Sequence, residues 1–162
     1  MINIFNLTLN KVKRDNDIHC GKNVILLSQT YYTLENDKKI YLQAGIINNQ
    51  IFKNDKFWED LLDMEITREF QKLVLIEENN LIKKNNIEGI KETNKTQFEN
   101  IIFGQIITIC NNMINFQLNK EKVYQLINPK IKDYQISQDI VDNIKNIIDN
   151  RLNEEKTKHQ KE

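Results

Sequence analysis

The residues that could carry covalent chemistry in this chain are the adjacent His19 and Cys20. An imidazole beside a thiol can lower the thiol pKa and create a thiolate nucleophile. Neighbours along a helix point in different directions, so we interpret Cys20 as a helix contact and His19 as a solvated side chain. Cys110 lies in an apolar segment and is interpreted as a core thiol. Two Cys and two His offer no zinc spacing, so the sequence predicts no metal and no cofactor.

Carboxylates crowd one segment, which carries Glu59, Asp60, Asp63, Glu65 and Glu69. Paired acids perform general acid–base catalysis when they are buried. Glu59, Asp63, Glu69 and Lys72 fall between apolar positions, which is typical of a solvated helix face. The functional alternative is an acidic docking surface for a basic partner helix. The glycines are far apart and form no phosphate-binding loop. The sequence therefore predicts a protein that is not an enzyme.

Composition narrows the function classes further. The 162 residues include 23 basic and 23 acidic side chains, so the formal net charge is zero. Without a basic face, nucleic-acid binding is disfavoured, and no apolar run approaches the roughly 18 residues of a membrane span. The first ten residues lack the pattern of a secretory signal. We therefore expect a cytoplasmic globular protein with free thiols, no nucleic-acid partner and no membrane insertion.

Apolar residues at helical spacing predict the elements that must position these groups. One stripe predicts a first short helix, and a second predicts a helix of about five turns capped by Asp17. The stripes consist of Ile2, Phe5, Leu9 and Val12, and of Cys20, Val24, Leu27, Tyr31 and Leu34. These two helices are expected to form an antiparallel hairpin. A polar turn over residues 35–39 and a short helix over residues 41–47 follow.

A long amphipathic helix is predicted next, capped by Asp55 and continuing to about Ile76. Residues 77–96 are rich in Asn and Lys and are predicted to be an exposed loop. Residues 98–118 are apolar on nearly every side, which predicts a buried helix; a strand over residues 101–109 is the alternative.

Two shorter segments complete the predicted fold. Asn119 and Pro129 bracket a short helix, and Ser137 caps the last one. We expect a single domain over residues 1–152, an all-α irregular helical bundle in which the antiparallel helix hairpin packs around the central buried helix. The charged tail, residues 153–162, has no apolar residue, and a neighbouring protein is expected to hold it.

Two groups of residues go beyond composition. One contains Leu27 to Tyr32, Tyr41-Leu42, Ile51-Phe52 and Phe57-Trp58-Glu59, and the other contains Asn100 to Ile106, Thr108, Asn112-Met113, Phe116 and Leu118 to Lys120. In this order they resemble the helical domain named after the SET-binding factors, the inactive myotubularin-related phosphatases that also carry a DENN module. The resemblance spans residues 2–149. Phe52 stands where the family usually has Trp, and neither a DENN nor a phosphatase domain fits in this chain.

The resemblance implies a helical interaction module associated with membrane traffic or the cytoskeleton, with no catalytic residues. We therefore predict a non-catalytic adaptor or structural subunit of a larger cytoplasmic assembly. The alternatives are a small enzyme or redox regulator using Cys20 or the acidic helix, and an RNA-binding helical module. A groove beside Trp58 is the expected place for a peptide partner, and the candidate residues are Tyr31, Tyr32, Phe52, Phe57, Trp58, Glu59, Phe103, Gly104, Gln105 and Asn112.

These residues also have structural interpretations. Trp58 is expected in the core because it is large and neighbours Phe57. Gly104 within an apolar helix indicates a close helix–helix contact, because glycine otherwise weakens a helix by about 1 kcal/mol relative to alanine. Gln105 and Asn112 are expected to hydrogen-bond to backbone groups of neighbouring loops.

Overall fold

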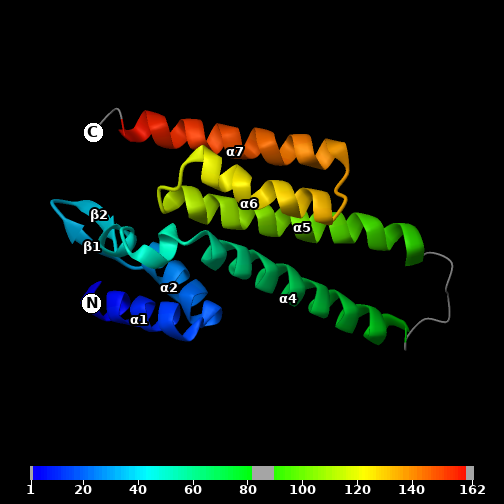
Figure 1. Cartoon of the computed structure of the whole chain (residues 1–162), viewed down its shortest axis with the longest axis horizontal. Helices are drawn as coiled ribbons and strands as arrows, with labels where there is room; N and C mark the ends of the chain where they lie inside the picture. The colour runs from blue at the N-terminus through cyan, green and yellow to red at the C-terminus, as the bar shows by residue number, and fades with distance from the viewer. Residues whose placement is uncertain (1, 82–89, 160–162) are drawn as a thin grey trace. The chain divides into compact units, whose positions relative to one another are not determined.

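The computed structural model describes residues 2–81 and 90–159, and it places side chains for residues 2–76, 95–155 and 157. Over these residues the chain forms seven α-helices, one 3-10 helix and one two-stranded sheet (Figure 1). The all-α fold class is therefore confirmed. No helix in the described part combines the length and the apolar character that a bilayer crossing requires.

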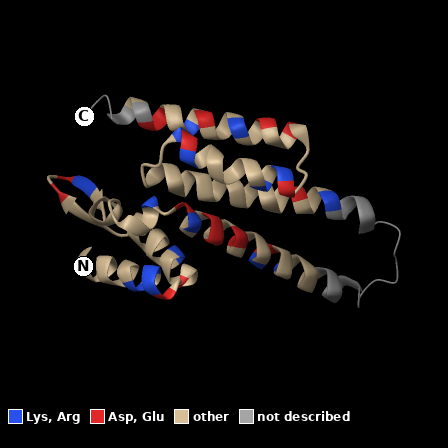
Figure 2. Ribbon diagram, viewed as in Figure 1, with Lys and Arg blue, Asp and Glu red and all other residues tan. Residues whose placement is uncertain are grey.

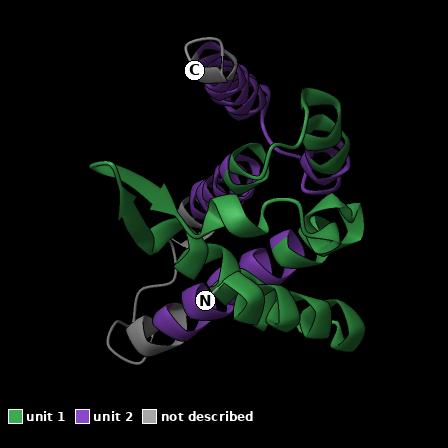
Figure 3. Ribbon diagram, turned by 90° about the vertical axis from the view of Figure 1, so that its left-hand side faces the viewer, with its two compact units in different colours: residues 1–61, 112–126 green, residues 62–111, 127–162 purple. Residues whose placement is uncertain are grey.

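Two compact units divide the chain (Figure 3). The first unit comprises residues 1–61 and 112–126, and the second comprises residues 62–111 and 127–162. Helices α4, α5 and α6 contribute residues to both units. A single domain over residues 1–152 stays a prediction.

The first unit begins with α1 (Ile2–Asp15) and α2 (Ile18–Thr30), which contact each other. The carboxylate of Asp17 accepts a hydrogen bond of 3.0 Å from the backbone N–H of Cys20, so the predicted cap is confirmed. This bond satisfies one of the free N–H groups with which every helix begins.

A β-hairpin follows α2, where the sequence predicts helix as far as Leu34. Strands β1 (Tyr32–Glu35) and β2 (Lys38–Tyr41) pair antiparallel, with Glu35 opposite Lys38. The turn residues Asn36 and Asp37 have φ of 49° and 61°. Two positive φ angles in a two-residue turn are the geometry that matches the twist of a hairpin. The helix prediction was wrong here because aromatic and β-branched residues also favour strands.

Short helices connect the hairpin to α4. They are α3 (Gln43–Ile46) and a 3-10 helix, η1 (Gln50–Lys53). Helix α4 (Asp55–Leu81) then begins with Asp55 as its first helical residue. The preceding Asn54 side chain accepts from the N–H of Lys56 at 3.2 Å, so Asn54 takes the capping role that the sequence assigns to Asp55.

Helices α4 and α5 (Ile90–Asn115) reach into the segment predicted as a loop. Helix covers residues 77–81 and 90–96, so the prediction of a loop over 77–96 was wrong at both ends; residues 82–89 lie outside the described residues. The Asn and Lys residues did not end these helices, because each lowers helix stability by less than about 1 kcal/mol relative to alanine.

Helix α5 is buried on one side and partly open on the other. Ile102, Ile106 and Ile109 are buried, whereas Phe103 and Ile107 are half-buried. The prediction of helix rather than strand was correct, but the prediction of burial on nearly every side was not.

The chain ends with α6 (Lys120–Asp133) and α7 (Gln138–His159). Pro129 lies inside α6 rather than after it. Helix α7 continues through most of the charged tail, where Arg151 pairs with Glu155 at 3.0 Å within the helix. Pairs of this kind add a few tenths of a kcal/mol to the stability of a helix, and the expectation that a neighbouring protein holds the tail stays a prediction. Residues 160–162 of the predicted tail lie outside the described residues.

Candidate functional site

The residues that carry the family resemblance divide between the two units. Phe103, Gly104 and Gln105 belong to the second unit. The others, Tyr31, Tyr32, Phe52, Phe57, Trp58, Glu59 and Asn112, belong to the first unit.

Three of the candidate aromatic rings form the core of the first unit. Phe52 and Trp58 have no exposed surface, and Phe57 is 3% exposed. The indole N–H of Trp58 donates a hydrogen bond of 2.9 Å to the backbone carbonyl of Phe52. Phe116 packs on Phe52 with ring centroids 4.1 Å apart. The core interpretation of Trp58 is confirmed, and these rings do not line an open groove.

Four other residues of the family resemblance, Asn112, Gln105, Glu59 and Gly104, differ in burial and contacts. The amide of Gln29 donates to Oδ1 of Asn112 at 3.1 Å, so the partner of Asn112 is a side chain rather than the expected loop backbone. Gln105 is half-buried, and Glu59 is exposed on α4. A Cβ added at Gly104 would meet no atom of the described residues within 4 Å, so the expected close contact at Gly104 is absent there.

Tyr31 and Tyr32 instead belong to an exposed apolar surface. We call this the hairpin surface and define it by Tyr31, Tyr32, Leu34, Ile40 and Tyr41, which are 39% to 66% exposed. All eight strand residues are exposed. Scattered exposed apolar residues are ordinary, but several together on one short element are typical of an interaction site.

The two faces of the hairpin differ in character. Tyr32 and Tyr41 are opposite each other and make an edge-on contact with centroids 5.6 Å apart. The ammonium of Lys39 lies 4.5 Å from the centroid of the Tyr32 ring, a cation–π contact. Side chains alternate between the two faces along a strand, so Leu34 lies on the same face as Tyr32, Lys39 and Tyr41, and Ile40 lies on the opposite face.

Sequence reasoning missed Leu34, Ile40 and Tyr41 as parts of a surface, although a signal was present. Asn36-Asp37 separates two short runs that contain Tyr, Thr and Ile, and Asn and Asp tolerate positive φ better than most residues, so the pair is a modest signal for a two-residue hairpin turn. Tyr31 and Leu34 also continue the helical spacing of the preceding apolar residues, and this pattern favoured the helix prediction over the hairpin.

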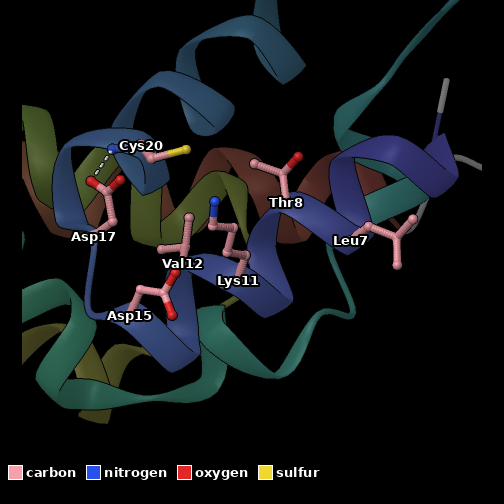
Figure 4. A pocket seen from close by; sticks show the side chains of 7 residues that line it. All are labelled: Leu7, Thr8, Lys11, Val12, Asp15, Asp17 and Cys20. Atoms are coloured by element: carbon pink, nitrogen blue, oxygen red, sulfur yellow. Dashed lines mark hydrogen bonds between the residues drawn. The ribbon is translucent and has the colours of Figure 1, made fainter.

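Cys20 lies at a hollow between α1 and the start of α2 (Figure 4). The hollow has a volume of about 390 Å³ and is lined by Leu7, Thr8, Lys11, Val12, Asp15, Asp17 and Cys20. Its carboxylates already have partners, since Asp17 caps α2 and Asp15 pairs with Arg14 at 2.9 Å. His19 is not among the lining residues, so the hollow does not pair the thiol with an imidazole.

The second thiol lies in the core of the protein. Cys110 is buried, and burial raises the pKa of its thiol to about 12. A thiol with this pKa stays protonated and unreactive at neutral pH. Within residues 2–81 and 90–159, no cluster of His, Cys, Asp and Glu could hold a metal ion.

Acidic residues recur along α4, drawn in red in Figure 2, but they do not share one environment. Glu65 is 5% exposed, and its Oε2 atom lies 2.7 Å from Nη2 of Arg68. Asp63 accepts hydrogen bonds of 2.6 and 2.7 Å from Lys130 of α6. Lys72 holds the pKa of Glu69 below its usual value by hydrogen bonding. Glu65 therefore lies off the solvated side of α4, and Asp63 joins α4 to α6.

Comparisons with protein-family models, curated proteins and solved structures found no match.

Proposed function

We propose that this chain is a non-catalytic protein-interaction module, an adaptor or structural subunit of a larger cytoplasmic assembly. The observation that carries the proposal is the hairpin surface, which presents three tyrosines and two aliphatic side chains on an element whose strands are exposed throughout. Tyrosine is enriched at protein interfaces because it combines a large apolar ring with a polar end. The resemblance to the SET-binding-factor helical domain supports the same proposal and adds an association with membrane traffic or the cytoskeleton.

Co-purification with a tagged chain, expressed in the cells that make it, tests the proposal. We expect wild-type protein to retain a stoichiometric partner, and the double substitution Tyr31→Ser and Ile40→Ser to lose it. The matched control replaces Ile4 and Leu7 with Ser, because these α1 residues are similarly exposed but lie outside the hairpin surface.

Two results would overturn the proposal. One is recovery of a lone chain under every condition. The other is an enzymatic or redox activity that disappears with Cys20→Ser, which would favour a thiol-based function at the hollow beside α1.

A further inference from the structure

The outer edge of β1 carries backbone groups without partners in the described part of the chain. Glu35 and Lys38 flank a two-residue turn, which makes them a hydrogen-bonded pair, and such pairs alternate along an antiparallel ladder. Thr33 and Ile40 are therefore the next hydrogen-bonded pair. The Leu42 N–H donates to the Tyr31 carbonyl at 3.0 Å, so Tyr31 and Leu42 are hydrogen-bonded in the same way, two positions further along the hairpin.

It follows that the N–H and C=O groups of Tyr32 and Leu34 point away from β2. An isolated two-stranded sheet is marginally stable in water, and an open edge is a template for another strand. The hairpin projects from the helices of the first unit (Figure 1), which leaves its strands accessible.

We propose that β1 pairs antiparallel with β1 of a second copy of this chain, around a two-fold axis at Thr33. This inference rests on the proposed function, since it names one partner of the hairpin surface. In this register Tyr32 lies opposite Leu34 of the second copy, and each pair exchanges two backbone hydrogen bonds. The four outward-pointing groups of each strand are all satisfied, which makes the contact self-complementary and closed.

Side chains favour the same register. Residues opposite each other in a sheet share a face, so Tyr32, Leu34 and Tyr41 of both copies lie on one largely apolar face, with Lys39 of each copy on its outer strands. Glu35 lies opposite Tyr31 of the second copy, which separates the two Glu35 side chains by four positions, or about 14 Å along the sheet. At this distance their repulsion is screened.

Pairing through β2 is less favourable. It would bring Lys39 of each copy onto the same face as diagonal neighbours, and like charges at this distance repel. In addition, α2 and α3 both contact β2. Pairing β1 with β2 of another copy would leave one edge open on each chain and would generate filaments instead of a closed dimer.

Disulfide trapping tests the register directly. In the proposed dimer the two Thr33 residues form a non-hydrogen-bonded pair with Cα atoms about 4.5 Å apart, within the range that a disulfide spans. In a Cys20→Ser background, we expect Thr33→Cys to form covalent dimers at least about tenfold faster than the matched control Glu35→Cys. Both positions are exposed on the same face of β1, so neither substitution disturbs the core.

Sedimentation of the uncross-linked full chain provides the second measurement. A contact of this size is expected to be weak, with dimer appearing at about 0.1 to 1 mM chain. Leu34→Lys should abolish the dimer, whereas Leu26→Lys, on the similarly exposed residue of α2, should leave it unchanged.

A monomer at the highest concentration, or equal trapping rates for the two cysteine variants, would overturn the inference. If the same monomeric chain still retained a cellular partner that the Tyr31→Ser, Ile40→Ser variant lost, the proposed function would stand without the dimer. If the chain formed no dimer and also retained no cellular partner, the proposed function would be overturned as well.

Discussion

A Cβ atom added at Gly21 would lie 2.7 Å from Cε2 of Phe57 and 3.2 Å from a methyl group of Val12. Real Cβ atoms do not approach an aromatic ring so closely, so α2 can pack on the core of the first unit only because residue 21 lacks a side chain. The close glycine contact expected at Gly104 occurs here instead.

Gly21→Ala should therefore destabilise the protein. Phe57 is 3% exposed and has little space to move, so we expect a loss of about 1 to 3 kcal/mol in the free energy of unfolding. Urea unfolding followed by circular dichroism measures this loss. A stability equal to wild type would contradict the packing of α2 on Phe57.

Gly104→Ala should have the opposite effect and stabilise the protein. No described atom lies within 4 Å of the added methyl group, and alanine favours the helix. We expect a gain of about 0.5 to 1 kcal/mol in the free energy of unfolding, in the same urea experiment. A loss of stability at this position would show that a neighbour packs against Gly104.

Trp58 is the only tryptophan of the chain, so its fluorescence reports on the core alone. Because the indole is fully buried, emission should be blue-shifted, resistant to iodide quenching and red-shifted on unfolding. Trp58→Phe removes the hydrogen bond to the Phe52 carbonyl and leaves a cavity, which should lower stability by about 2 to 4 kcal/mol. Efficient quenching in the native protein would argue against burial.

The two cysteines should differ in reactivity. Native protein should react with an aromatic disulfide reagent at one thiol, the half-buried Cys20, and at Cys110 only after unfolding. Cys20→Ser should abolish the native reaction. If the native Cys20→Ser protein still reacted at neutral pH, Cys110 would be accessible, contrary to its burial.

Cys110 also predicts a pH dependence of stability. Its thiol titrates near 9.0 when unfolded and at about 12 when folded, so the unfolded state loses the proton first. The stability associated with this thiol is complete well below pH 9 and falls as pH rises toward 12, by about 1.4 kcal/mol at pH 10. Cys110→Ala should remove this part of the pH dependence, measured as the difference between the two urea titrations at pH 8 and pH 10.

The Glu65–Arg68 pair should contribute more to the free energy of unfolding than the Lys72–Glu69 pair beside it. Arg68→Met leaves the buried Glu65 carboxylate without its 2.7 Å partner, and we expect a loss of about 1 to 2 kcal/mol after allowing for the partial exposure of Arg68. Lys72→Met breaks a largely exposed pair and should cost at most about 0.5 kcal/mol. Equal effects would contradict the difference in burial.

The existence and type of most helices followed from local spacing, and the size of Trp58 and its neighbour Phe57 predicted that it is a core residue. The sequence also predicted the helix cap at Asp17 and the free thiols of Cys20 and Cys110, because these features depend on residues close in the chain or on residue type. Pattern reasoning was wrong over residues 31–35, where Tyr and Leu suit helix and strand alike, and the Asn36-Asp37 turn decided in favour of strand.

Tertiary packing alone decided which glycine is crowded, which carboxylate is buried and which aromatic rings remain exposed. Gly21 and Gly104 look alike in sequence, as do Glu65 and Glu69, because their differences arise from atoms distant in the chain. Tyr32 and Trp58 are both aromatic, yet only Trp58 is enclosed, because Phe52 and Phe116 come from separate segments to cover it. Burial is a property of all the surrounding segments at once, so no local pattern can specify it completely.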